Sequence, residues 1–264
     1  MSQIGLRRQQ RRSLSLVSPV FLSLLLSLMG KPALAFDIPP PPPPLYQGLI
    51  FPLFPGSSAL PFSSSSTRNA SGDKADKTVK AAAPVSPSGT ATSTQTPALD
   101  RAKLQAHARE LANFAPSAQR EAVAQSYLQS FEGYLQLERK LSLPENDVAN
   151  GLAAFIAGNY MALNQVEVPD AHFARLAGQL REALPKNPGF QTMTAQAKRK
   201  LYEQGAMQGM FMALARLAFL KQPQAAAEQN YRAAARAALE AALQLPAEQV
   251  RIDAQGLHLG TRAP

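Results

Sequence analysis

The chain of 264 residues contains no cysteine and no tryptophan. The lack of cysteine excludes disulfides, zinc sites built on thiolates, thiol nucleophiles and the acylation that anchors lipoproteins. Stability must therefore come from the burial of apolar side chains, and hydrophobic residues account for 45% of the sequence. We expect one domain of ordinary size once the low-complexity segments are set aside.

Histidine is also scarce, with three residues in the whole chain, His107, His172 and His258. Each falls on a different predicted element, so no two of them have the spacing of metal ligands. The sequence also lacks the Gly-x-Ser-x-Gly motif of serine hydrolases and a glycine-rich loop for phosphate. We therefore expect neither a metal ion nor a cofactor.

The first 35 residues have the three parts of a secretory signal peptide. Four arginines precede an apolar run over Leu14–Met29, and small residues follow at Ala33 and Ala35. This order predicts cleavage after Ala35 and a mature chain that is periplasmic or secreted. A membrane anchor is the alternative, but serine and proline interrupt the run, which is shorter than the roughly 20 residues that cross a bilayer. We therefore expect no stable membrane insertion after cleavage.

The net charge of +9 comes largely from this predicted signal, which has five basic and no acidic residues and leaves +4 for the rest of the chain. A nucleic-acid partner requires basic residues that cluster on one face of the protein. The basic run Lys198–Lys200 is interpreted as a solvent-exposed helical turn. The sequence therefore predicts no nucleic-acid partner.

Residues 36–97 are low in complexity, with prolines over Pro39–Pro44 and serines over Ser63–Ser66. Such a composition cannot bury enough apolar surface to fold. The sequence predicts a disordered tail over 36–97, which acts as a spacer, and a helical domain over 98–264.

From residue 98 onward, apolar residues recur with the period of a helix, and prolines and glycines lie mostly at boundaries. We predict six helical segments: about Leu99–Ala112, one opening at Pro116–Ser117, Asn146–Leu163, Pro169–Leu184, Thr194–Leu220 and Gln224–Leu245. The alternation of Val250, Ile252, Leu257 and Leu259 indicates a short hairpin after them. The predicted fold class is all-α, a compact bundle of about five to six helices with a possible short C-terminal β-hairpin, preceded by the disordered tail.

Two of these segments, Val148–Leu163 and Gly205–Leu220, are apolar all the way round, which is typical of central helices. Both also carry small residues at helical spacing, namely Gly151, Ala154 and Gly158 in the first and Gly205, Gly209 and Ala213 in the second. Glycine inside a helix is unfavourable unless it lets two backbones approach closely. We therefore expect these two helices to pack tightly against each other.

The most polar cluster lies at the start of the third segment, with Glu145, Asn146, Asp147 and Asn150 followed by Asn159. One interpretation is a site that uses carboxylates for acid–base work or for a cation. The structural interpretation, which we favour, is that Asn146 or Asp147 caps the helix and that Asn150 and Asn159 bond to neighbouring backbone.

Glu203, beside Tyr202 on the fifth segment, is the other carboxylate expected to be partly buried. A buried carboxylate needs a cationic partner, and Arg139, Arg175 and Lys200 are the candidates. The weak catalytic candidates are thus Asp147 and Glu203. The candidate binding residues are Asn146, Asp147, Asn150, Tyr202 and Glu203.

Three stretches of the chain resemble an uncharacterised family of secreted bacterial proteins, the domain of unknown function 6683 (DUF6683). These stretches are Asn146–Ala149 continuing to Phe155–Tyr160, Leu201–Glu203 with Gly209–Ala213, and Tyr231–Leu243. The resemblance covers about residues 116–256. It implies a bacterial envelope or secreted setting and supplies no catalytic residues.

The functional hypothesis is an exported, non-catalytic helical module that binds an unknown protein or envelope component. The alternative is an envelope hydrolase that uses carboxylates such as Asp147 and Glu203, which would require both acids to face one open cleft. A protein that perturbs membranes is less favoured, because no strongly basic amphipathic helix is present.

Overall fold

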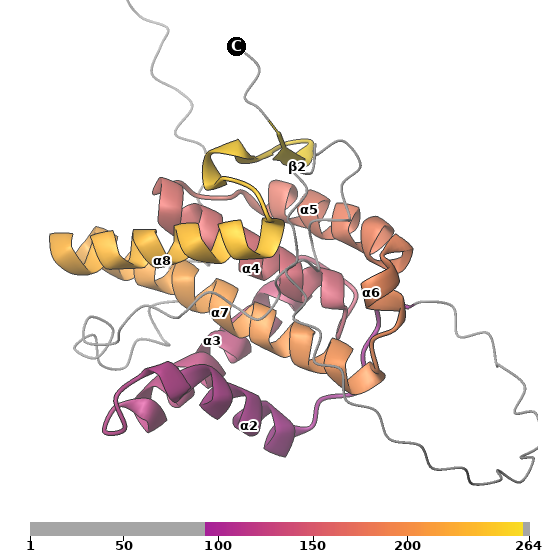
Figure 1. The fold of residues 1–264 in the computed structure, drawn as a ribbon, viewed down its shortest axis with the longest axis horizontal. Coiled ribbons are helices and arrows are strands. Elements are labelled where there is room, and N and C mark those ends of the chain that lie inside the picture. The colour runs from indigo at the N-terminus through magenta and orange to yellow at the C-terminus, as the bar shows by residue number, and fades with distance from the viewer. Residues whose placement is uncertain (1–92, 261–264) are drawn as a thin grey trace, which may run out of the picture.

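The computed structural model describes residues 93–260. The predicted signal over 1–35, residues 36–92 of the predicted tail and residues 261–264 lie outside this range. Within it, the chain forms seven α-helices followed by a two-stranded antiparallel hairpin (Figure 1). The prediction of an all-α bundle with a short C-terminal hairpin is confirmed.

The helices are α2 (Arg101–Leu111), α3 (Arg120–Lys140), α4 (Val148–Asn164), α5 (Asp170–Ala183), α6 (Pro188–Gln191), α7 (Ala195–Lys221) and α8 (Ala225–Leu243). Side chains that cap free backbone N–H groups explain several of their starts: Asp100 caps α2, Asp147 caps α4, Asn187 caps α6 and Thr194 caps α7. The four-residue α6 lies in a stretch that was predicted to be a boundary between helices.

Helices α4 and α7 form the centre of the bundle, and α3, α5 and α8 pack around them (Figure 1). Nearly every side chain of α4 is buried, as expected for a helix that is apolar all the way round. Between residues 93 and 260, no helix combines the length and the apolar character needed to cross a membrane.

The contact between α4 and α7 depends on glycine. A Cβ atom added to Gly158 would lie 1.9 Å from the carbonyl oxygen of Gly209, and one added to Gly209 would lie 2.0 Å from that of Ala154. Gly151 and Gly205 meet the opposite helix in the same way. The predicted tight packing of these two helices is therefore confirmed.

The apolar face of α3 completes the core on the other side of α7. Val123, Tyr127, Phe131 and Tyr134, spaced by three or four residues, are all fully buried. Their rings meet aromatic residues of α7: the centroids of Tyr127 and Phe211 are 5.0 Å apart, and those of Phe131 and Tyr202 are 5.9 Å apart.

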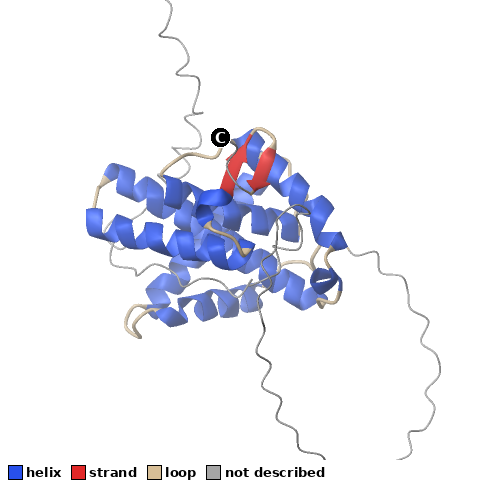
Figure 2. Ribbon diagram, turned by 45° about the horizontal axis from the view of Figure 1, so that its top comes forward, coloured by secondary structure: helices blue, strands red, loops and turns tan. Residues whose placement is uncertain are grey.

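The hairpin consists of β1 (Val250–Asp253) and β2 (Gly256–Leu259), with Ile252 paired to Leu257. Gln179 of α5 holds it to the bundle, because its side chain accepts from the N–H of Leu257 at 2.7 Å and donates to the carbonyl of Gln255 at 3.0 Å. Figure 2 shows the two strands lying against the helices. This attachment stabilises a hairpin that would be marginal alone.

Candidate functional site

The predicted polar residues gather at the N-terminal end of α4. Asp147 caps this helix, since its Oδ1 accepts a hydrogen bond from the N–H of Ala149 at 2.9 Å. Asn146 precedes the cap with a left-handed backbone (φ 58°), and its Oδ1 accepts from Nη1 of Arg199 at 2.6 Å. Of the two capping residues that the sequence offered, the structure uses Asp147.

The second oxygen of Asp147 belongs to an ion pair with α5. Nε of Arg181 donates to Oδ2 of Asp147 at 2.6 Å, and Nη2 of the same guanidinium donates to Oδ1 of Asn150 at 2.6 Å. The side chain of Asp147 is fully buried, whereas 31% of the Arg181 side chain is exposed. The side chain of Arg181 therefore lies between solvent and the two predicted residues Asp147 and Asn150.

Asn150 connects this ion pair to a buried carboxylate that the sequence interpretation missed, Glu138 of α3. Nδ2 of Asn150 donates to Oε1 of Glu138 at 3.1 Å and to the carbonyl of Pro144 at 2.7 Å. The Asn150 side chain thus bonds to other side chains as well as to the backbone partner that was expected. Asn159 bonds to neighbouring backbone as expected, since its Nδ2 donates to the carbonyl of Phe155 at 2.8 Å.

Glu138 is almost completely buried and is surrounded by hydrogen-bond donors. The hydroxyls of Tyr134 and Tyr202 donate to its two carboxylate oxygens at 2.9 and 3.0 Å. Burial raises the pKa of Glu138 above its ordinary value, although these hydrogen bonds oppose the rise. A signal for this residue was present in the sequence, because Glu138 follows Phe131 by seven positions and Tyr134 by four, on the buried stripe of α3.

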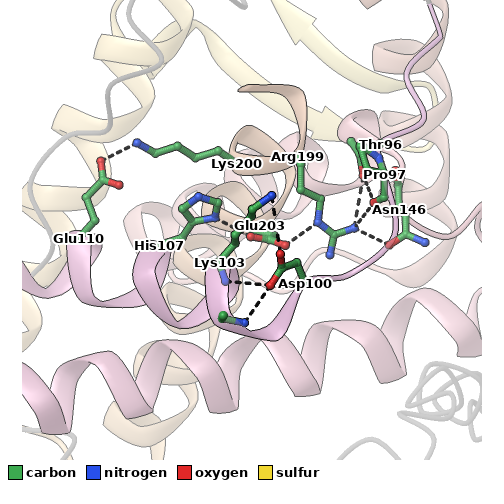
Figure 3. A network of polar contacts seen from close by, with 11 residues as sticks. Thr96, Pro97, Asp100, Lys103, His107, Glu110, Asn146, Arg199, Lys200 and Glu203 are labelled. Carbon is green, nitrogen blue, oxygen red and sulfur yellow. Dashed lines mark hydrogen bonds and ion pairs between the residues drawn. The ribbon is translucent and has the colours of Figure 1, made fainter. Parts of the chain in front are cut away.

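Glu203 of α7 follows Tyr202 in the chain and is also fully buried. Nε of Arg199, one turn earlier, donates to its Oε1 at 2.5 Å, and Nδ1 of His107 lies 2.6 Å from its Oε2 (Figure 3). The predicted partners Arg139, Arg175 and Lys200 are wrong. Lys200 instead bonds to Glu110 of α2 at 2.6 Å, because residues 199 and 203 share a helical face and residue 200 lies on another.

The basic run Lys198–Lys200 is also not the solvent-exposed turn that the sequence predicted. Lys198 and Arg199 are both buried, and Lys198 lies over the ring of Phe190 at 4.3 Å from its centroid. The guanidinium of Arg199 lies 5.0 Å from the centroid of Tyr202. Desolvation lowers the pKa of Lys198. These cations are therefore structural partners of buried groups.

The residues just before α2 pack against the predicted site. Residues 93–97 lie against residues 146–148, with an antiparallel bridge between Gln95 and Asp147. Figure 3 shows the Arg199 guanidinium between Glu203 on one side and Thr96, Pro97 and Asn146 on the other. Residues that were placed in the disordered tail thus contact the bundle.

The five predicted site residues fall into two hydrogen-bonded clusters. One contains Asp147, Asn150 and Tyr202 with Tyr134, Glu138 and Arg181, and the other contains Asn146 and Glu203 with His107 and Arg199. The guanidinium of Arg199, 5.0 Å from the ring centroid of Tyr202, joins the two clusters, which we together call the polar network. Each carboxylate in it accepts hydrogen bonds from protein donors, and neither Asp147 nor Glu203 is open to solvent. Over residues 93–260, no three His, Asp or Glu side chains converge in a way that could hold a metal ion. The arrangement stabilises the junction of α2, α3, α4, α5 and α7.

A family model described as a family of unknown function (DUF6683) matches residues 58–260. No curated protein and no solved structure matches the chain.

Proposed function

The chain belongs to the DUF6683 family, and from that premise we propose that it is an exported, non-catalytic helical module that binds a protein or another component of the bacterial envelope. The observation that carries the proposal is the burial of both candidate catalytic acids. Asp147 and Glu203 have fully buried side chains, and each is held by an arginine. A general acid or base must come within hydrogen-bond reach of its substrate, and these two carboxylates already use their oxygens within the fold.

The hydrolase alternative would need Asp147 and Glu203 to face one open cleft. In the structure, Arg181 covers Asp147 on the side of α5, and His107 and Arg199 enclose Glu203. A substrate would have to displace an ion pair before it met either acid, and breaking the fully buried pair of Arg199 with Glu203 costs about 3 to 5 kcal/mol in typical cases. The geometry therefore favours a structural role for both acids.

The export part of the proposal rests on the sequence. The basic, apolar and small-residue parts of the first 35 residues are those of a secretory signal. A fold without cysteine needs no oxidative step after export, because its core is built from apolar helices.

The test is a binding experiment with the chain that starts at Phe36, immobilised and exposed to bacterial envelope extract over a series of salt concentrations. Asp147→Asn is the matched variant, since asparagine also caps helices well and removes only the carboxylate. Glu203→Gln serves as the second variant, with its melting temperature measured alongside.

We expect a component that binds saturably and equally to the unaltered chain and to the folded Asp147→Asn variant. The same preparations are screened for hydrolysis of envelope polysaccharide and peptide. Hydrolysis by the unaltered chain that is lost in folded Asp147→Asn would refute the non-catalytic assignment. The absence of any saturable component would refute the binding assignment.

A further inference from the structure

Residues 93–97, which we call the strap, run in extended form along the loop that precedes α4. The N–H of Thr96 donates to the carbonyl of Asn146 at 2.9 Å, and the N–H of Val148 donates to the carbonyl of Thr94 at 2.9 Å. These two hydrogen bonds flank the bridge between Gln95 and Asp147. The strap is therefore bound through its main chain, as a peptide is when it adds a strand to a protein.

Two cations of α7 hold the strap from its other side. Nζ of Lys198 donates to the carbonyl of Ser93 at 3.3 Å, and Nη1 of Arg199 donates to the carbonyl of Pro97 at 3.0 Å. We call residues 146–148 together with Lys198 and Arg199 the strap groove. Every main-chain contact in it could be made by an extended segment of another polypeptide.

The groove also recognises side chains at alternate positions of the strap. Thr94 is buried, while Ser93, Gln95 and Pro97 are exposed. The hydroxyl of Thr96 donates to the carbonyl of Asn146 at 2.9 Å and lies 3.3 Å from Nη1 of Arg199. The groove therefore fits a small buried side chain at position 94 and a hydroxyl at position 96, two residues later.

The strap is bound weakly enough to dissociate from the strap groove. It buries one side chain and is otherwise held by hydrogen bonds, which contribute little net free energy because water replaces them on release. Ordering the backbone of the strap also costs conformational entropy, and this cost is similar in size to the net free energy that the hydrogen bonds contribute. In addition, Nη2 of Arg199 is buried without a hydrogen-bond partner, so the strap leaves one donor of the groove unused.

We propose that the strap groove is a binding site for an extended, threonine-rich peptide segment, and that the strap is its intramolecular occupant. The occupant from outside is the same segment of a second copy of this chain, because this is the sequence that the structure seats in the groove. Threonine recurs at positions 90, 92, 94 and 96, so the required alternation extends beyond the strap. The inference rests on the proposed function in that it assigns binding rather than catalysis.

The test uses the chain from Phe36 with Thr96→Pro, which removes both the N–H and the hydroxyl that bind Asn146. Gln95→Pro is the matched control. It introduces the same ring at the neighbouring position, where the N–H bonds to the side chain of Ser93 and not to the groove. The probe is a fluorescent peptide with the sequence of residues 90–98, and a peptide with glycine in place of Thr94 and Thr96 is its control.

We expect the peptide to bind Thr96→Pro about tenfold or more tightly than it binds the unaltered chain and Gln95→Pro, because a tethered strap competes at an effective concentration on the order of millimolar. The glycine peptide should bind none of them. Tagged Thr96→Pro should also retain the untagged, unaltered chain, which supplies its strap from a second copy.

Circular dichroism and a cooperative melting transition identify folded variants. If folded Thr96→Pro does not bind the peptide, or binds it no better than Gln95→Pro does, the groove assignment is wrong. If it binds the peptide but not the unaltered chain, the second copy is the wrong occupant. Either failure leaves the binding experiment with envelope extract unaffected, so the two proposals can fail separately.

Discussion

At the scale of single residues, the two candidate acids differ in the environment of their arginine partners. Arg181, the partner of Asp147, has 31% of its side chain exposed, whereas Arg199, the partner of Glu203, has 6%. An arginine that loses its carboxylate can be hydrated only where water reaches it. The same chemical change should therefore have different consequences at the two positions.

We predict that Asp147→Asn lowers the free energy of unfolding by about 1 kcal/mol, because the cap is kept and Arg181 turns to solvent. Glu203→Gln should lower it by about 3 kcal/mol, because Arg199 stays buried without a counter-charge. Urea unfolding at neutral pH measures both values. Equal effects would contradict the assignment of Arg199 as a buried partner.

Glu138 provides a prediction about pH. Its pKa is raised in the folded protein by burial, so the folded state holds the proton more tightly than the unfolded state. The stabilisation from this residue is complete below the ordinary pKa of glutamate and is lost as the pH rises through the folded pKa. Glu138→Gln removes this dependence and keeps an acceptor for the tyrosine hydroxyls.

We therefore expect the cost of Glu138→Gln to be smaller at pH 7 than at pH 4, measured as the difference in free energy of unfolding from the unaltered chain. Glu132→Gln is the matched control, since Glu132 is exposed on the same helix and is not among the groups that shift the pKa of Glu138. A cost for Glu138→Gln that is the same at both pH values, or larger at pH 7, would show that burial does not favour the protonated form of Glu138.

At the scale of elements, the glycines of α4 and α7 set the distance between the two central helices. Alanine in place of a helical glycine normally stabilises a helix by up to about 1 kcal/mol. At Gly158 the added Cβ would meet the backbone of Gly209, which cannot rotate away as a side chain would. The packing term should therefore outweigh the helix propensity.

We predict that Gly158→Ala lowers the free energy of unfolding by about 3 kcal/mol or more. Gly178→Ala on α5 is the control, because a Cβ there has no neighbour within 4 Å, and it should raise the stability by about 0.5 to 1 kcal/mol. Thermal and urea unfolding of both variants test this. Stabilisation by Gly158→Ala would mean that the two backbones are not in contact.

The elements also show how far the sequence can predict this fold. Periodicity and small-residue spacing predicted the bundle and the contact of α4 with α7, since both depend on residues close in sequence. The pairing of His107 with Glu203 joins positions 96 residues apart, and no local pattern encodes it. For Lys198 and Arg199, charge alone argued for exposure, and burial became favourable only through Phe190, Glu203 and the strap.

At the scale of the whole molecule, the strap is held to the bundle mainly by hydrogen bonds, whereas α2 is held by both polar and apolar side chains. Lys200 bonds to Glu110, and His107 bonds to Glu203. Leu104 and Ala108 are the residues of α2 with the most deeply buried side chains. Because Leu104 and Ala108 anchor α2 in the core, we expect release of the strap to free the residues before α2 and to leave the helix in place.

The last prediction concerns export of the whole chain. Ala33 and Ala35 flank Leu34 in the pattern that a signal peptidase cleaves, which needs small residues at the first and third of these positions and tolerates others between them. Expressed with its first 35 residues in a Gram-negative bacterium, the chain should accumulate outside the cytoplasm with Phe36 as its first residue, identified by N-terminal sequencing and intact mass. Ala35→Asp should leave the longer, uncleaved chain, whereas the control Leu34→Ala should be processed normally. An unaltered chain that stays in the cytoplasm and keeps its first 35 residues would remove the basis for an envelope partner, and a binding partner would then have to be sought inside the cell.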